Sequence, residues 1–119
     1  MRILIFFTVG FLALCSCRKD KVASVTPVED NCDSTVSFVN DVKPILSINC
    51  STSGCHDENT ASAGYRFVTY DQIEAETEMI LRVMRHESGV SPMPQGGNKL
   101  SDSTIQTIEC WEQQGKLYN

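Results

Sequence analysis

The chain has few of the residues and patterns on which most enzyme sites depend. Its 119 residues include two histidines, too few for most hydrolytic metal sites. No internal repeat, no phosphate-binding glycine loop and no serine, histidine and aspartate set for nucleophilic catalysis is visible in the sequence. These absences argue against a nucleotide-dependent enzyme and against a serine hydrolase.

Basic residues are also scarce. Residues 32–119 carry six Lys or Arg against twelve Asp or Glu, hence a net charge of minus six. Proteins that bind nucleic acid present clustered positive charge, so this balance argues against a nucleic-acid partner. It favours a basic partner protein, although a merely solvated acidic surface accounts for the composition equally well.

The sequence lacks an apolar run long enough to cross a bilayer as a permanent helix. Residues 1–16 carry one positive charge, at Arg2, followed by an apolar stretch from Ile3 to Leu14. This layout is typical of a secretory signal peptide. We therefore expect the mature protein to lie outside the cytoplasm.

The end of the signal, Leu14-Cys15-Ser16-Cys17, resembles a lipobox, in which cleavage leaves a lipid-modified cysteine as the first residue. Cys17 fits this role better than Cys15, because Ser16 is small enough for the position before cleavage. We predict that lipidated Cys17 anchors the protein to a bacterial membrane and begins a tether, 17–31, without helical or strand periodicity. A plain signal peptide or an uncleaved anchor is the alternative.

Cysteine, in contrast, is plentiful, with six residues in the chain. Cys50 and Cys55 supply two thiols that can add to the vinyl groups of a haem, and His56 follows at once with an imidazole that can reach its iron. The usual spacing places two residues between such cysteines, whereas this sequence has four. Gly54 lets the longer loop bulge outward, so we interpret the motif as a variant covalent haem c site.

Two other interpretations use the same residues. Cys50 and Cys55 could form a short-loop disulfide in an exported domain, with His56 an ordinary surface residue. Alternatively, the two thiolates and His56 could bind zinc, with His86 as the fourth ligand. A methionine further along the chain favours haem over both.

Met93 stands between two prolines, in a stretch at 88–99 whose glycines and prolines forbid a helix. It has no apolar neighbours at helical spacing, so packing in a core explains it poorly. The prolines restrict the backbone and lower the cost of ordering it, which suits a loop that presents a thioether sulfur to iron. Met79 and Met84 fall within a helical apolar repeat and are expected to pack in the core.

Three helical patterns cover much of residues 32–119. The first follows Ser37 and contains Pro44, so this helix is either kinked there or begins late, with Asp41 as its N-cap. The second spans 71–87 and ends at His86, a cation suited to a helix C-terminus. The third begins after a Ser101 cap and ends near Gly115. Its apolar positions, expected to face the core, are Ile105, Ile108 and Trp111.

Aromatic residues lie between the first two helical patterns, after a polar surface loop at 57–64. Tyr65 and Phe67, with Tyr70 as a further candidate, bring apolar bulk close to the proposed haem, where these residues are expected either to form its wall or to pack in the core. Arg66 is expected either to pair with a haem propionate or to remain solvated.

The two cysteines that remain in the domain are predicted to form a disulfide. On the 3.6-residue helical period, Cys110 lies roughly 160 degrees from Ile108 and so points away from the apolar face. An outward-facing cysteine in an oxidising compartment requires a partner. Cys32 is the one left once the haem and lipid sites are assigned.

The order of these features resembles the small c-type cytochrome domains of bacterial surface lipoproteins. The resemblance covers residues 37–115 and depends on Asp41-Val42-Lys43-Pro44-Ile45-Leu46 before Cys50, on Gly54-Cys55-His56, on Pro92-Met93-Pro94, and on the last helix with Trp111 and Gly115. It implies a mostly α-helical, cytochrome c-like domain over 32–119 that packs around haem c. It also implies that His56 is the proximal axial ligand of the iron and Met93 the distal one.

Together these observations predict a c-type cytochrome that passes single electrons to a redox partner protein. With both axial positions of the iron occupied, substrate would not reach it, so we expect electron transfer and no enzymatic activity. A haem-free lipoprotein stapled by disulfides, with a binding or structural role in the envelope, is the alternative. A haem sensor or peroxidase-like enzyme is a third interpretation, which requires Met93 to leave the iron or never to bind it.

Overall fold

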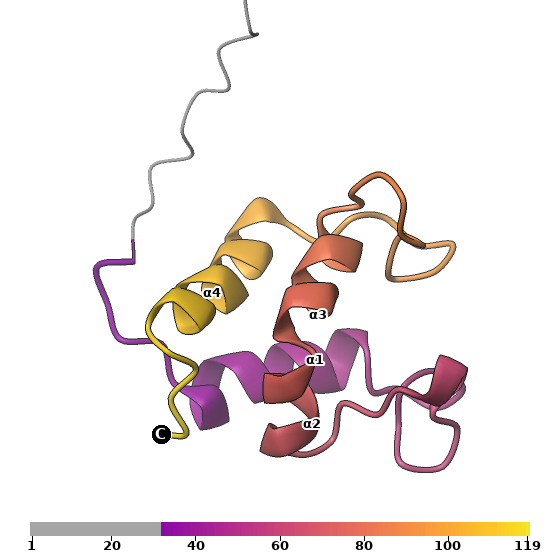
Figure 1. The fold of residues 1–119 in the computed structure, drawn as a ribbon, viewed down its shortest axis with the longest axis horizontal. Helices are drawn as coiled ribbons and strands as arrows, with labels where there is room; N and C mark the ends of the chain where they lie inside the picture. The colour runs from indigo at the N-terminus through magenta and orange to yellow at the C-terminus, as the bar shows by residue number, and fades with distance from the viewer. Residues whose placement is uncertain (1–31) are drawn as a thin grey trace, which may run out of the picture.

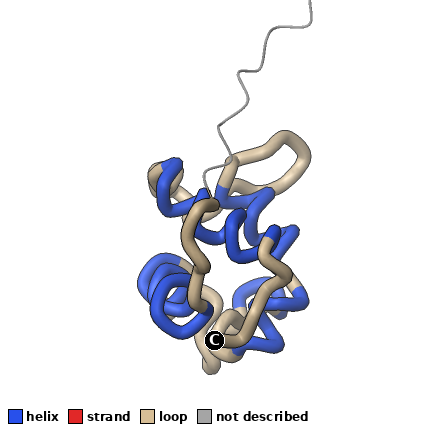
Figure 2. Tube along the Cα trace, turned by 90° about the vertical axis from the view of Figure 1, so that its left-hand side faces the viewer, coloured by secondary structure: helices blue, strands red, loops and turns tan. Residues whose placement is uncertain are grey.

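A computed structural model describes residues 32–119 of the chain. The predicted signal peptide at 1–16, Cys17 and the tether at 17–31 lie outside the described residues. Within 32–119 the structure consists of helices joined by loops and contains no strand (Figure 2). The prediction of a mostly α-helical fold is confirmed.

The chain before Cys50 is one helical segment with two geometries. A π-helical turn, Phe38–Val42, leads directly into α1, Lys43–Asn49. Pro44 lies in the first turn of α1, where the missing backbone donor of proline is tolerated. The segment therefore delivers Cys50 from the end of a helix, as the sequence predicts.

Ser37 caps this first segment. Its hydroxyl accepts a hydrogen bond from the Asn40 amide at 3.1 Å, and the Asp41 carboxylate accepts one from the Ser37 amide at 2.7 Å. Of the two alternatives that the sequence left open, a helix kinked at Pro44 and a helix that starts late with Asp41 as its N-cap, the late start is wrong. Because Ser37 caps an earlier start, Asp41 lies inside the first turn and reaches back to the cap.

The predicted second helix is two helices, α2 at Tyr70–Ala75 and α3 at Thr77–Met84. Glu76 separates them with φ −109° and ψ 10°. The buried hydroxyl of Thr77 donates to the Ile73 carbonyl at 2.9 Å, an acceptor that a continuous helix would offer to the Thr77 amide. This side-chain bond accounts for the break that periodicity alone did not predict.

The last helix, α4 at Asp102–Gln113, agrees with its sequence pattern. Ser101 is its N-cap and accepts a hydrogen bond from the Thr104 amide at 3.2 Å. Gly115 follows the helix with φ +87°, a left-handed conformation that glycine adopts without strain. The predicted inward positions are buried, with exposed fractions of 3% at Ile105, 0% at Ile108 and 0% at Trp111.

The core lies where the first helical segment, α3 and α4 meet (Figure 1). Its largest fully buried side chains are Trp111, Phe38, Leu46, Ile73, Leu81, Met84, Ile108, Val42 and Thr77. Phe38 contacts the ring of Tyr70 edge to face at a centroid distance of 5.0 Å. The Trp111 indole donates to the Leu117 carbonyl at 2.9 Å, so its polar atom is satisfied although the side chain is buried.

The structure contains the predicted disulfide between Cys32 and Cys110, whose Cα atoms are 5.3 Å apart. The predicted outward position of Cys110 is wrong, since only 4% of this residue is exposed. The chain at 34–36 covers that side of α4, where Gln114 accepts from the Val36 amide at 2.8 Å and donates to the Ser34 carbonyl at 2.9 Å. The disulfide thus joins this covering segment to α4.

Candidate functional site

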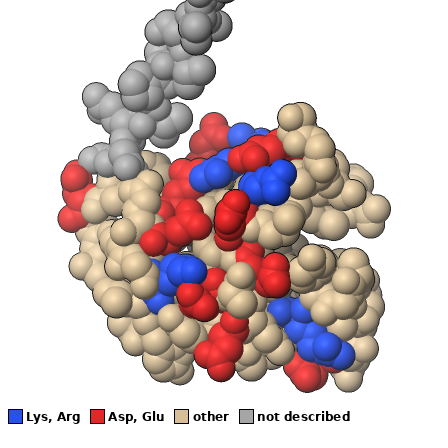
Figure 3. Space-filling view, viewed as in Figure 1, with Lys and Arg blue, Asp and Glu red and all other residues tan. Residues whose placement is uncertain are grey.

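Two long loops, one after α1 and one after α3, extend to the same side of the molecule (Figure 1). Between them lies a cavity of about 550 Å³, visible as a cleft on the right of Figure 3. This volume is in the range typical of small-molecule and cofactor sites. The cavity is lined by Asn49, Cys50, Thr52, Gly54, Cys55, His56, Ser62, Ala63, Tyr65, Phe67, Met79, Ile80, Val83, Met84, Val90, Ser91, Met93, Pro94, Gln95 and Leu100.

This cavity brings together the four residues that the sequence assigns to haem. Cys50, Cys55 and His56 reach it from the loop after α1, and Met93 reaches it from the loop after α3. Among the described residues, none that lines the cavity is Lys, Arg, Asp or Glu. The side chains that surround these four residues are therefore mainly apolar or small and uncharged.

The loop from Cys50 to His56 closes on itself through its backbone. Cys50 ends α1 by donating its amide to the Leu46 carbonyl at 2.9 Å, and its own carbonyl accepts from the His56 amide at 3.1 Å. Gly54 adopts φ +85°, a conformation that other residues reach only with strain. The four residues between the cysteines thus form a compact loop, two of whose members, Thr52 and Gly54, line the cavity.

His56 is oriented by its backbone and ring contacts. Its Nδ1 lies 3.2 Å from the Tyr65 carbonyl oxygen, which can only accept, so Nδ1 carries the proton. In that tautomer Nε2 keeps its lone pair for a metal. The Phe67 ring lies against the imidazole at a centroid distance of 4.8 Å, and the Phe67 amide donates to the His56 carbonyl at 3.0 Å.

Cys50 and Cys55 are not joined to each other in the described structure, so the alternative short-loop disulfide is not formed. Cys50 is half-buried and Cys55 is exposed. Burial, with a smaller contribution from Cys55, raises the pKa of the Cys50 thiol to about 11. Cys50 is therefore protonated near neutral pH, which makes it a weak nucleophile for disulfide exchange.

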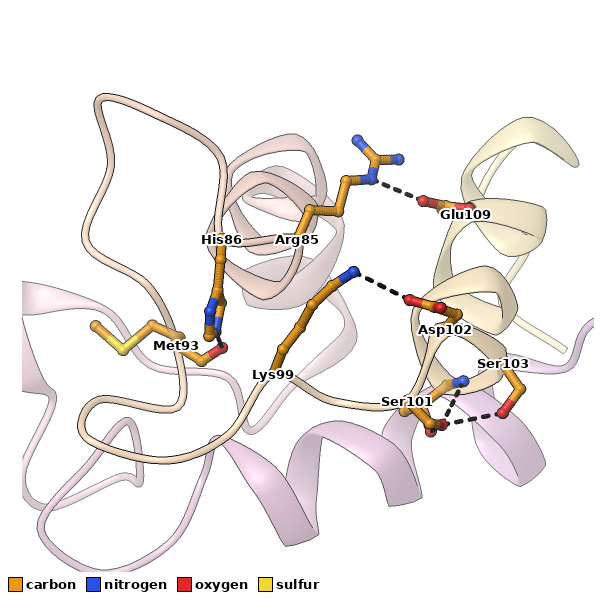
Figure 4. Close-up of polar contacts among 9 residues, drawn as sticks. Arg85, His86, Met93, Lys99, Ser101, Asp102, Ser103 and Glu109 are labelled. Atoms are coloured by element: carbon orange, nitrogen blue, oxygen red, sulfur yellow. Dashed lines mark hydrogen bonds and ion pairs between the residues drawn. The ribbon is translucent and has the colours of Figure 1, made fainter. Parts of the chain in front are cut away.

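The backbone of Met93 is held on both sides. Its amide donates to the Val83 carbonyl at 3.0 Å, and its carbonyl accepts from Nε2 of His86 at 3.1 Å. Figure 4 shows the Met93 carbonyl turned toward His86 while the thioether extends away from α4. The sequence offered two roles for His86, a cation at a helix end and the fourth ligand of an alternative zinc site. No local sequence pattern indicates its hydrogen bond to a residue seven positions later.

Met79 is placed differently from its prediction, and the structure distinguishes between the alternatives for Tyr70, which packs against the core, and Arg66, which is exposed. Tyr70 does not wall the cavity, because its ring packs on Phe38 and its hydroxyl donates to the Lys116 carbonyl at 2.7 Å. Met79 lines the cavity with 36% of its surface exposed, so its predicted place in the core is wrong. Arg66 does not line the cavity and donates from Nε to the Glu58 carbonyl at 3.1 Å.

The remaining predictions near the cavity agree with the structure. Tyr65 and Phe67 both line it, and Met84 is fully buried in the core with its side chain at the cavity wall. The set of ligands needed for a zinc site is not assembled: residues 32–119 contain no group of three or more His, Cys, Asp or Glu placed to hold a metal ion. His86 bonds to the Met93 carbonyl instead.

Comparison with known protein families, with curated proteins and with solved structures finds no match for this chain. In the part of the chain that the structure describes, no helix is both long enough and apolar enough to cross a membrane. The functional assignment consequently depends on the residues of the cavity.

Proposed function

We propose that the protein is a c-type cytochrome that carries single electrons through a haem bound covalently in this cavity. The observation that carries the proposal is that two thiols, an imidazole and a thioether from two distant loops line one mainly apolar cavity. Few other cofactors use this combination, because thiols bond to haem vinyl groups while imidazole and thioether are its common axial ligands.

The residues of the cavity fit a haem. The S–H bonds of Cys50 and Cys55 would add across the two vinyl groups, each sulfur bonding one carbon and each hydrogen the other. His56, already oriented through Nδ1, would supply Nε2 to one face of the iron, and Met93 would supply its sulfur to the other. When bound, the haem supplies an iron that cycles between the ferrous and ferric states.

The cavity also sets where the charged edge of a haem would lie. No cationic side chain among the described residues lines the cavity, so the propionates would face its open, solvated side. The apolar remainder of the ring would be covered by Phe67, Ile80 and Leu100. Thioether ligation favours the softer ferrous iron and raises the potential relative to ligation by two imidazoles.

Two occupied axial positions favour electron transfer over catalysis. We propose that the acceptor or donor is a redox partner protein and that lipidated Cys17 holds the domain on the extracytoplasmic face of a bacterial membrane, periplasmic or at the cell surface. Export supports the haem assignment, because bacterial c-type haem is attached outside the cytoplasm, where disulfides such as Cys32–Cys110 also persist.

The test is a pyridine haemochrome spectrum of denatured protein that was expressed with haem-maturation machinery. We expect the haem to stay with the chain after denaturation, and Cys50→Ala together with Cys55→Ala to release it. If the wild-type chain carries no haem, the cytochrome proposal is wrong and the alternative remains, a haem-free envelope lipoprotein stapled by Cys32–Cys110. That alternative is compatible with the disulfide but gives no role to the cavity.

Ligation by Met93 has its own test. The oxidised wild-type protein should show the weak near-infrared charge-transfer band between sulfur and iron. Met93→Ala should erase the band, keep the covalent haem and let the iron bind cyanide or carbon monoxide. A wild-type protein that lacks the band and binds carbon monoxide readily would favour a sensor or a peroxidase-like enzyme.

A further inference from the structure

We infer that His86 is a positioning residue that holds the Met93 backbone so that its thioether faces the cavity. What Met93 does once it is positioned rests on the proposed function. The contact itself concerns two residues of the protein and can be tested whether or not haem is bound.

The first observation is the conformation of His86. The chain leaves α3 through Arg85 and turns at His86 with φ +57°, in the left-handed region that costs most residues free energy. Glycine or asparagine would adopt this conformation with less strain. Histidine, like asparagine and aspartate, adopts the left-handed region more often than most residues. The conformation alone does not select histidine over these residues, whereas the bond that its side chain makes does.

The second observation is the bond that this side chain makes. Nε2 of His86 lies 3.1 Å from the Met93 carbonyl oxygen, which can only accept, so Nε2 carries a proton. Both the neutral tautomer protonated at Nε2 and the cation can donate this bond. The contact therefore links the end of α3 to the methionine.

The third observation is that few other polar contacts hold the loop at 88–100 in place. Within the described loop at 88–100, both backbone hydrogen bonds to the rest of the domain involve Met93: its amide with Val83 and its carbonyl with His86. The other polar link is the exposed ion pair of Lys99 with Asp102 at 3.0 Å (Figure 4). Such exposed pairs contribute little. Without His86, one backbone bond and packing would hold the Met93 peptide.

These contacts act on the orientation of the thioether. Val83 accepts from the Met93 amide and His86 donates to the Met93 carbonyl, so the two peptide groups that flank the Met93 Cα are both held and its side-chain direction is restricted. Figure 4 shows the side chain extending away from His86, toward the side on which the cavity lies. His86 touches neither the cavity nor any reacting atom, so it acts only through Met93.

The experiment compares His86→Gln with His86→Leu in the haem-loaded protein. Glutamine and leucine are equally strained in the left-handed conformation of residue 86, but only glutamine keeps a hydrogen-bond donor near the position of Nε2. The net contribution of one hydrogen bond corresponds to about a two- to tenfold change in an equilibrium constant, here between the loop conformation that holds Met93 in place and one that releases it. We expect cyanide to bind oxidised His86→Leu two- to tenfold more tightly than His86→Gln and the near-infrared band to weaken only in His86→Leu.

Two further measurements separate failure of this inference from failure of the proposed function. His86→Gly removes the donor without strain and should behave like His86→Leu, which excludes misfolding as the cause. Exchange of the Met93 amide with deuterium, measured on the full chain as purified, should be faster in His86→Leu than in His86→Gln even if no haem is present. Equal exchange, bands and cyanide affinities in the two variants would overturn the positioning role, whereas absence of haem would overturn only the proposed function.

Discussion

The half of the domain built on α4 and the half that surrounds the cavity differ in what fills their interiors. Around α4, protein fills the space: Trp111 and Ile108 have no exposed surface, and a disulfide fastens the covering segment. Around the cavity, apolar side chains such as Met79 and Val83 line a space of about 550 Å³.

This difference suggests that different groups cover the apolar surface of the two halves and so stabilise them. The α4 half buries its apolar surface against itself and should be ordered without any ligand. The cavity half leaves apolar surface facing water, which is unfavourable unless another apolar group covers it. A flat macrocycle between the loops would provide that cover, and for this reason we interpret the cavity as its binding site.

Charge is distributed in the same uneven way. Figure 3 shows acidic side chains gathered over the body of the molecule, beside the cleft and not inside it. Three ion pairs there involve Glu87 or Glu109 with Arg82 or Arg85, at the junction of α3 and α4. The rim of the cavity contributes no charged side chain among the residues described. We therefore expect long-range steering of a partner to come from the acidic body.

The largest expected effect comes from a substitution that destabilises the half of the domain built on α4. Trp111→Ala removes a fully buried indole and its bond to the Leu117 carbonyl, which should cost about 3–5 kcal/mol of unfolding free energy. Urea denaturation followed by circular dichroism measures the loss. Trp111→Phe keeps most of the packing and serves as the matched control. A loss below 1 kcal/mol in Trp111→Ala would show that this half is not the main source of stability.

The disulfide should have the next largest effect. Cys32 and Cys110 are 78 positions apart in sequence, and closing so long a loop restricts the unfolded chain by about 4 kcal/mol in the entropy model, with measured gains often smaller. Reductant, or Cys32→Ala with Cys110→Ala, should lower the thermal midpoint. Covalent haem should remain, because thioethers resist reduction. Two free thiols found by mass spectrometry in exported protein would contradict the pairing.

Local sequence patterns predicted the parts of the fold that local chemistry determines. Ser101 was identifiable as a cap because its hydroxyl serves the helix that starts beside it. The buried stripe Ile105, Ile108 and Trp111 follows from helical spacing. The disulfide pairing followed from counting cysteines, without any knowledge of which side of α4 the partner covers.

The errors concern residues whose environment is set by segments far along the chain. Met79 and Met84 fit one apolar repeat and both line the cavity, but only Met84 is fully buried, whereas Met79 is 36% exposed. The sequence left two places open for Tyr70 because its partners, Phe38 and Lys116, are distant in sequence. The link between His86 and Met93 was likewise invisible, since it depends on how the loop at 88–100 returns to α3.

A pH-dependent prediction sharpens the description of the cavity half. Folding raises the pKa of Cys50 to about 11, so the protonated thiol favours the folded state. This contribution is complete below the unfolded pKa, near 9, and is lost as the pH rises toward 11. Haem-free protein should thus lose about 2–3 kcal/mol of stability over this range beyond what Cys50→Ala loses.

The haem-loaded protein provides the control for this titration. Its Cys50 sulfur would be a thioether with no proton to lose, so the difference from Cys50→Ala should disappear. Urea midpoints measured for both proteins at pH values from about 8 to about 11 give the comparison. The same alkaline loss in haem-free wild type and Cys50→Ala would mean that the thiol is more exposed than the structure indicates.

The smallest expected effect is at Met79, and it should depend on whether the cavity is filled. In haem-free protein Met79→Ala removes a side chain that is 36% exposed and packs against little, so unfolding free energy should fall by less than about 1 kcal/mol. The same truncation at Met84, which has no exposed surface, should cost about 2–5 kcal/mol.

In haem-loaded protein Met79 would lie against the macrocycle, and the cost of Met79→Ala should rise by about 1 kcal/mol through lost apolar contact. Urea titrations of both variants, each with and without haem, measure the four values. If Met79→Ala costs the same in both states while Met84→Ala is large in both, haem does not occupy the space beside α3, and the covalent site would have to face away from this cavity.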